Sequence, residues 1–161
     1  DVLLQNHTHM HATMLDSRGL SSTCVGPLVR SSLWVRGLGD LQKELGIAYL
    51  FITHDLAVVR YLADRVAVMY AGKIVEVGSV RDIFNKPSHP YTEALLASVP
   101  KMEEDVDRLY AIEGQPPLLH DLPVGCSFAD RCPYVMDRCR EEYPPEFPVD
   151  EGHYSACWRL A

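Results

Sequence analysis

The chain has 161 residues, of which 47% are hydrophobic and 23% charged; this is ordinary globular composition and excludes a fibrous or wholly disordered chain. Fifteen basic and 22 acidic side chains give a net charge of −7, and no basic cluster offsets it, so we expect no binding to nucleic acid. The longest apolar run, residues 47–53, is far shorter than the roughly 20 residues that a membrane-spanning helix needs.

Residues 1–39 show neither a helical period nor the alternation of a strand, and we expect a divergent or disordered N-terminal segment there. Leu41 and Leu45 then lie one helical turn apart, and Gly46 suits the left-handed position that closes a helix, so a helix is predicted to end at this point. Residues 47–53 are nearly all apolar, with aromatic and branched side chains, which is typical of a strand covered on both faces in a parallel sheet. A helix followed by a buried strand predicts an α/β fold.

The next residues predict a helix and a hairpin. Apolar side chains recur at helical spacing over residues 56–63. Residues 65–70 and 73–77 favour strands, and the Ala-Gly pair between them predicts an antiparallel hairpin.

Two short helices are predicted after the hairpin. Ser79 with Asp82 three residues later resembles a capping box, which marks the start of a helix. Pro90 suits the beginning of a second helix over residues 91–98, because proline fits the first turn, where its missing N–H costs nothing.

The composition changes after residue 100. We expect a folded α/β part over residues 40–100, a linker over residues 101–120 that is rich in acidic residues and proline, and a small irregular module over residues 121–161. The last part holds four of the five cysteines and few large aliphatic side chains. Such a segment needs a metal or a covalent staple to fold.

Four cysteines in this last part predict a ligand set. The first residues, Asp1 to His11, do not form a secretory signal, so we expect a reducing cytoplasm in which cysteines are thiols or metal ligands. Intervals of five, six and 17 residues wrap more easily around a [4Fe–4S] cubane than around zinc, whose paired cysteines are usually about two to four residues apart. We therefore favour a [4Fe–4S] cluster over zinc, with free thiols or disulfides as the remaining alternative. The four cysteines are Cys126, Cys132, Cys139 and Cys157, and Cys24 and His153 are further residues that could join them.

His54 directly follows the apolar run. In open α/β sheets, ligands collect outside the carboxyl ends of the strands, so this position suits a side chain that contacts a phosphate. Position alone, however, favours a histidine that only hydrogen-bonds the backbone.

Several motifs resemble one family. Residues 49–60, Tyr-Leu-Phe-Ile-Thr-His-Asp-Leu-Ala-Val-Val-Arg, and residues 63–78 resemble the switch-histidine region of ABC transporter ATPases. His-Pro-Tyr-Thr at 89–92, Gly-Gln-Pro-Pro at 114–117 and the later Gly-Cys-Ser-Phe, Arg-Cys-Pro and Ala-Cys-Trp elements are similar to the C-terminal extension of bacterial dipeptide and oligopeptide importers. The resemblance covers roughly residues 40–161.

The resemblance implies that residues 40–100 are the C-terminal part of an ABC-type nucleotide-binding domain and that residues 121–161 are a cysteine-rich module. It implies peptide uptake powered by ATP and magnesium, with His54 as the switch histidine that contacts the γ-phosphate. The implied ligands of an iron–sulfur cluster are Cys126, Cys132, Cys139 and Cys157. The implied partners are the membrane subunits of the transporter and a partner ATPase subunit, at the inner face of the cell membrane and without insertion into it.

The parts that phosphoryl transfer needs are missing from these 161 residues. No G-x-x-x-x-G-K-[ST] loop and no Ser-Gly-Gly signature occurs, and no long apolar run ends in the Asp-Glu pair that holds magnesium. We therefore expect a truncated chain, divergent at its start, that does not hydrolyse ATP alone. The competing hypothesis is a free-standing iron–sulfur or zinc-binding interaction module.

Overall fold

The computed structural model describes residues 11–13, 32–98 and 112–161, with the side chains of residues 37–98 and 112–161. Over these ranges, none of the helices combines the length and the apolar character that crossing a membrane requires. The elements, in chain order, are β1 (His11–Thr13), α1 (Ser32–Leu45), β2 (Ile52–Thr53), α2 (Leu56–Leu62), β3 (Arg65–Tyr70), β4 (Lys73–Ser79), α3 (Val80–Asn85), α4 (Pro90–Ala97), η1 (Ala129–Arg131), α5 (Asp137–Glu141), β5 (Phe147–Asp150), β6 (His153–Ser155) and η2 (Trp158–Leu160).

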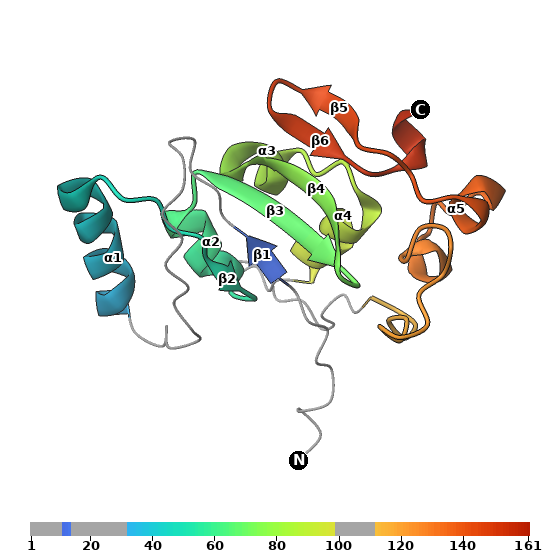
Figure 1. The fold of residues 1–161 in the computed structure, drawn as a ribbon, viewed down its shortest axis with the longest axis horizontal. Helices are drawn as coiled ribbons and strands as arrows, with labels where there is room; N and C mark the ends of the chain where they lie inside the picture. The colour runs from blue at the N-terminus through green and yellow to red at the C-terminus, as the bar shows by residue number, and fades with distance from the viewer. Residues whose placement is uncertain (1–10, 14–31, 99–111) are drawn as a thin grey trace, which may run out of the picture.

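A six-stranded antiparallel sheet in the order β2-β1-β3-β4-β6-β5 organises the molecule (Figure 1). Its centre is the β3–β4 hairpin, and α1 and α5 lie at opposite ends of the long axis (Figure 1). The sheet continues into the cysteine-rich segment, because Glu76 and Val77 of β4 pair with Ser155 and Tyr154 of β6. The hairpin and the last residues of the chain therefore share one hydrogen-bonded layer.

The predicted hairpin is confirmed. Ala71 and Gly72 connect β3 to β4 with φ angles of 48° and 79°. Two successive residues with positive φ are typical of the tight turn whose twist matches that of the flanking strands. A register shift between Val68 and Met69 adds a bulge to β3.

The predicted helix ends are confirmed as well. Helix α1 ends at Leu45, and Gly46 follows with a φ of 63°. At the start of α3, Ser79 Oγ accepts the Asp82 backbone N–H at 3.1 Å and donates to Asp82 Oδ2 at 2.6 Å. Pro90 is the first residue of α4, and His89 is its N-cap residue.

The strand predicted over residues 47–53 is wrong in its length and in its surroundings. Only Ile52 and Thr53 form β2, which pairs with β1 in the antiparallel direction, and the sheet topology of the described residues contains no parallel pair. Phe51 is buried but Ile52 is 48% exposed, so the segment is covered on one face only. An apolar run shows that a segment is able to be buried, whereas its neighbours decide how much of it is covered. Helices and a small sheet still agree with the α/β class in its coarse form.

The main core spans both parts of the chain. Phe128 from the cysteine-rich segment is 1% exposed and packs against Tyr70 and Tyr91 with ring centroids 5.3 and 5.4 Å away. The core residues are Val59, Val66, Val68, Tyr70, Val75, Ile83, Tyr91 and Phe128. A small second cluster around Cys139 and Trp158 is all that the C-terminal segment adds by itself among the described residues. The predicted part boundaries near residues 100–120 remain predictions, since residues 99–111 lie outside the described ranges.

Candidate functional site

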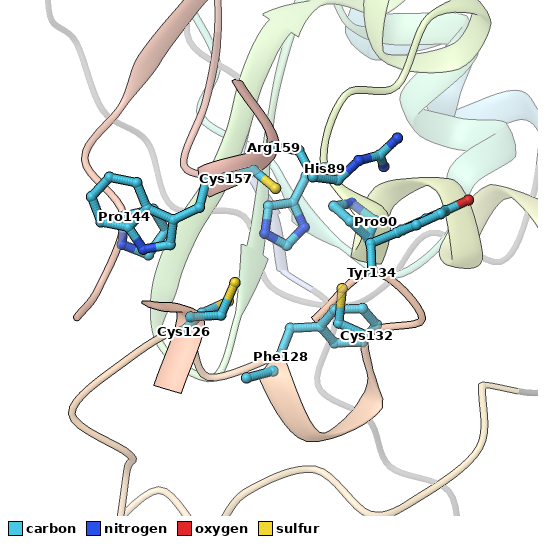
Figure 2. A pocket seen from close by; sticks show the side chains of 12 residues that line it. His89, Pro90, Cys126, Phe128, Cys132, Tyr134, Pro144, Cys157 and Arg159 are labelled. Carbon is cyan, nitrogen blue, oxygen red and sulfur yellow. The ribbon is translucent and has the colours of Figure 1, made fainter. Parts of the chain in front are cut away.

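A pocket between the start of α4 and the C-terminal segment brings all four predicted cysteines together (Figure 2). Its lining is formed by His89, Pro90, Cys126, Phe128, Ala129, Cys132, Tyr134, Cys139, Pro144, Cys157, Trp158 and Arg159. The sequence separates the first of these cysteines from the last by the whole segment that contains η1, α5, β5 and β6. Their convergence is therefore a property of the fold rather than of local spacing.

Short turns fix the cysteine backbones. The Cys126 N–H donates to the Cys139 carbonyl at 2.7 Å, which joins the loop before η1 to α5. The Cys132 N–H donates to the Ala129 carbonyl at 3.2 Å and closes η1. Gly125 permits this approach, because a Cβ at this position would overlap the backbone carbonyl of Cys139.

The thiols are free, buried or half-buried, and each of three has a backbone N–H directed at it. Burial raises the pKa of Cys126 to about 11, and it also raises the pKa values of Cys132 and Cys157. Hydrogen bonds from the backbones of Phe128, Tyr134 and Arg159, each two residues after a cysteine, act in the opposite direction. Such thiols stay protonated at neutral pH, and bound metal would convert them to thiolates that these N–H groups already face.

The four sulfurs share the pocket without closing around a single point. Over the described ranges, no group of three or more His, Cys, Asp or Glu side chains is arranged to hold a metal ion. Cys126, Cys132, Cys139 and Cys157 are all free, so the disulfide alternative is wrong for them. Cys24 lies outside the described residues.

A buried histidine forms one wall of the pocket. His89 is 1% exposed, and its Nδ1 accepts the backbone N–H of Tyr91 at 3.0 Å. Burial lowers the pKa of His89 to about 3, so the ring is neutral at physiological pH. Figure 2 shows this ring among the side chains of Cys126, Cys132 and Cys157.

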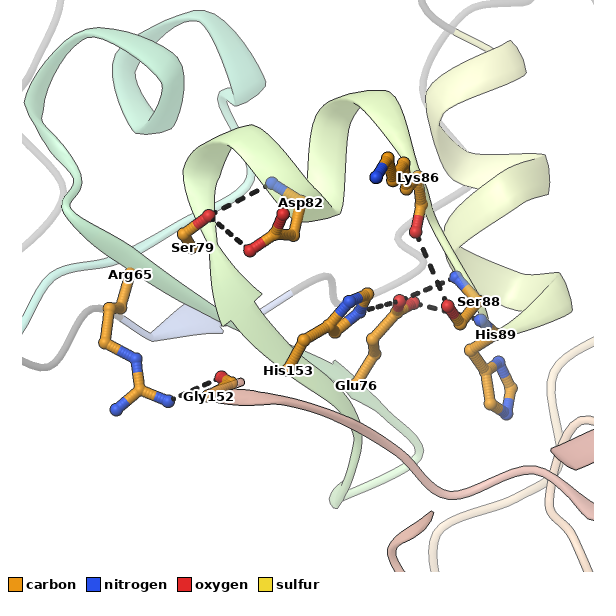
Figure 3. Close-up of polar contacts among 9 residues, drawn as sticks. All are labelled: Arg65, Glu76, Ser79, Asp82, Lys86, Ser88, His89, Gly152 and His153. Carbon is orange, nitrogen blue, oxygen red and sulfur yellow. Dashed lines mark hydrogen bonds and ion pairs between the residues drawn. The ribbon is translucent and has the colours of Figure 1, made fainter. Parts of the chain in front are cut away.

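A buried carboxylate holds the loop that carries this histidine (Figure 3). Glu76 Oε1 accepts the Ser88 N–H at 2.7 Å, and Oε2 accepts the His89 N–H at 3.1 Å. His153 Nε2 lies 2.8 Å from Glu76 Oε1, and both side chains are almost fully buried. His153 therefore contacts Glu76 rather than the pocket, and the suggestion that it could join the ligand set is not supported by its position.

A cation lies at the edge of the pocket. The Arg159 guanidinium stacks 4.0 Å from the ring centre of Tyr134 and lies 3.2 Å from Glu93 Oε1. Both Arg159 and Tyr134 belong to the pocket lining. The positive charge would favour an anionic group inside.

His54 lies elsewhere, exposed and directly after β2. The neighbouring Asp55 carboxylate accepts the N–H groups of Ala57 and Val58 at 2.9 and 3.3 Å, and so caps α2. His54 is not part of the pocket lining. Its predicted role at a γ-phosphate is independent of the cysteine site.

Sequence reasoning missed three residues of this region: Glu76, His89 and Arg159. For His89 a signal existed, since a residue directly before a helix-starting proline occupies the N-cap position. No sequence signal marks Glu76, because nothing in the sequence shows that β6 and the α3–α4 loop cover it.

Residues 75–139, which include His89 and three of the pocket cysteines, match the family model described as "Oligopeptide/dipeptide transporter, C-terminal region". This part of the chain is therefore similar to that family, and the predicted resemblance to ATP-binding subunits of peptide ABC transporters is confirmed.

Three relatives show how far the similarity extends. A probable peptide ABC transporter ATP-binding protein of Sinorhizobium fredii is 49% identical over 126 residues, which are 78% of this chain and 38% of the relative. The oligopeptide transport ATP-binding protein of Bacillus subtilis is 52% identical over 122 residues, 75% of this chain and 34% of the relative. The dipeptide transport ATP-binding protein of Bacillus subtilis is 46% identical over 119 residues, 74% of this chain and 36% of the relative. The chain thus spans little more than a third of the length of these relatives.

Proposed function

We propose that these residues form the C-terminal part of the ATP-binding subunit of a peptide ABC importer, bound to the cytoplasmic face of the cell membrane through the membrane subunits of the transporter. The observation that supports this most strongly is the 46–52% identity to proteins named for peptide transport over about three quarters of the chain. An alignment of 126 residues is far longer than the cysteine-rich residues 121–161, which argues against a free-standing metal module. The energy source is ATP with magnesium, and a second ATPase subunit is the other partner.

In this proposal His54 is the switch histidine that contacts the γ-phosphate of ATP. Its exposure directly after β2 leaves the imidazole free to meet a nucleotide. Asp55 contributes a capped helix start that fixes the backbone beside it. Positioning and charge stabilisation are most of what phosphoryl transfer requires from a protein, so a hydrogen-bond donor at this point is chemically useful.

A chimera tests the transport function. Residues 40–161 would replace the aligned part of the Bacillus subtilis oligopeptide transport ATP-binding protein, and uptake of a labelled peptide would be measured in cells that lack the native subunit. We expect uptake to be retained, and to be lost when the chimera carries His54→Ala. A chimera that is present at normal level and assembled with the membrane subunits, but transports nothing, would contradict the proposal.

We further propose that Cys126, Cys132, Cys139 and Cys157 hold a [4Fe–4S] cluster. All four line one pocket, and three of them face backbone N–H groups of the kind that stabilise bound thiolates. The intervals of five, six and 17 residues between them favour the larger cubane over zinc, whose paired cysteines are usually about two to four residues apart. A bound cluster supplies a one-electron centre and a staple between η1, α5 and η2.

Anaerobic purification tests this cofactor. We expect about four irons and four acid-labile sulfides per chain, with a broad absorption band in the visible range. Cys139→Ser should lose most of the iron, whereas Cys24→Ser, the matched change at the fifth cysteine, should keep it. A colourless protein with one zinc per chain would establish the zinc alternative instead, and a protein with neither metal would refute both.

A further inference from the structure

We propose that His89 is a hydrogen-bond donor to the group that the four cysteines hold, with its Nε2–H directed at a sulfur in the pocket. The inference rests on the proposed cluster and adds to it a residue that tunes the cluster without being a ligand. Three features of the structure support it: the tautomer of the ring, the place of the ring in the pocket, and the way the ring is held.

The tautomer follows from one hydrogen bond. Nδ1 of His89 accepts the Tyr91 backbone N–H at 3.0 Å, and in doing so it caps the N-terminus of α4. A neutral imidazole has one acceptor and one donor nitrogen. Because Nδ1 is the acceptor, the proton is on Nε2.

The position of the ring places the imidazole next to the cysteines. His89 lines the pocket with all four cysteines, and in Figure 2 the ring lies among the side chains of Cys126, Cys132 and Cys157. With the residue 1% exposed, water is a poor alternative partner for Nε2–H. An anionic sulfur is the acceptor that an occupied pocket offers.

The backbone of His89 is held by a hydrogen bond, and an aromatic ring lies beside its imidazole. Glu76 accepts the backbone N–H of His89 at 3.1 Å, and the ring of Phe128 lies 6.1 Å away, centre to centre. His153 binds the same carboxylate from β6, the strand that leads to Cys157 (Figure 3). One buried carboxylate therefore fixes both the backbone of His89 and the strand before the last cysteine. A donor held in this way costs no reorganisation when the charge of the bound group changes.

A hydrogen bond to a cluster sulfur stabilises the reduced, more negative state more than the oxidised state. His89 should therefore raise the midpoint potential. The substitution that isolates this effect is His89→Asn. Asparagine is among the best N-cap residues, so it retains the hydrogen bond from the Tyr91 N–H. Its side chain is too short to donate a hydrogen bond to a sulfur in the pocket. The exposed His120 provides the matched control, His120→Asn.

The experiment uses the full 161-residue chain, reconstituted anaerobically with iron and sulfide. Three quantities are compared between wild type, His89→Asn and His120→Asn: the iron content, the midpoint potential from a redox titration followed by absorbance, and the coupling of histidine nitrogen to the reduced cluster in ¹⁵N-histidine-labelled protein, measured by pulsed EPR. We expect full iron content in all three proteins. Only His89→Asn should show a more negative potential and lose the nitrogen coupling.

An unchanged potential in loaded His89→Asn, or a loaded wild-type protein without histidine nitrogen coupling, would refute the role of His89 and leave the cluster proposal intact. A wild-type protein that takes up neither iron nor sulfide would refute both. If His89→Asn takes up no cluster, the histidine nitrogen coupling of the wild-type protein decides the question. Its presence supports His89 as the hydrogen-bond donor, and its absence refutes that role.

Discussion

Glu76 and His153 reach each other from strands far apart in the sequence, and their burial makes the pair sensitive to change. Both side chains are almost fully buried, and the carboxylate also accepts two backbone N–H groups. Removal of a buried acceptor leaves each donor that it satisfied without a partner, which typically costs about 1–3 kcal/mol per donor.

Glu76 has three such partners, the Ser88 N–H, the His89 N–H and His153 Nε2, so we expect Glu76→Ala to lower the free energy of unfolding by about 3 kcal/mol or more. The matched control is Glu142→Ala, which removes the exposed 3.6 Å pair between Arg138 and Glu142 and should cost less than about 1 kcal/mol. Urea denaturation of the metal-free chains measures both values. Equal effects of the two substitutions would show that the buried carboxylate is not the anchor described above.

The residue scale also shows where sequence reasoning succeeds. The cysteines were predictable as a set, because four of them in a segment poor in aliphatic side chains need a common partner. The position of an imidazole among them was not predictable. His89 directly precedes α4, and it meets the cysteines because Phe128 packs against Tyr70 and Tyr91 and because β4 pairs with β6.

At the scale of elements, the boundaries that carry local chemistry were predictable. Each of these features depends on groups within about four residues of one another, so a short stretch of sequence contains all of them. They are Gly46 after α1, the Ala71-Gly72 turn and the Ser79 cap. The extent and partners of β2 depend on strands elsewhere, and the predicted parallel arrangement was wrong for that reason. The pairing of β4 with β6 was equally hidden, because β6 has only three residues and lies far from β4 in the sequence.

The Ser79 cap gives a prediction about pH. The hydrogen bond from Ser79 holds the pKa of Asp82 below its ordinary value of 3.8. Since the folded pKa is the lower one, the stabilisation is fully present above the unfolded pKa and is lost as the pH falls through the folded value. Ser79→Ala should therefore lower the melting temperature near neutral pH and reduce its further fall in acid. Thermal unfolding over a pH series measures this, and parallel curves for both proteins would contradict it.

At the scale of the whole molecule, apolar side chains lie open at the end opposite the cysteine pocket. Leu41, Leu45 and Ile52 are 43%, 58% and 48% exposed, and α1 and β2 carry them at the side of the molecule away from α5 (Figure 1). Exposed apolar side chains next to a short edge strand favour association.

We expect the isolated 161-residue chain to associate at micromolar concentration or above, as measured by light scattering. Leu41→Lys with Leu45→Lys should shift the distribution toward monomer, whereas the same charge at Leu119, which is exposed but lies outside α1 and β2, should have a smaller effect. A monodisperse wild-type monomer would contradict this expectation.

A second whole-molecule prediction concerns nucleotide. Without a G-x-x-x-x-G-K-[ST] loop among its 161 residues, the chain has no cradle for the phosphates, and a single histidine does not replace one. We expect no ATP hydrolysis above background and no change on His54→Ala. Calorimetry that detects tight binding of magnesium–ATP to this polypeptide would show that other residues form a cradle.

Because β4 pairs with β6, the last fifty residues do not form an independent unit that could be removed without effect on the rest. Cutting the chain at residue 112 would bare the outer edge of β4 and hydrate the carboxylate of Glu76. For the same reason, a cofactor bound by the C-terminal thiols would raise the thermal resistance of the central hairpin as well as that of its own loops, since a ligand stabilises everything that unfolds together with its site. Binding in the pocket and the stability of the sheet are thus thermodynamically coupled.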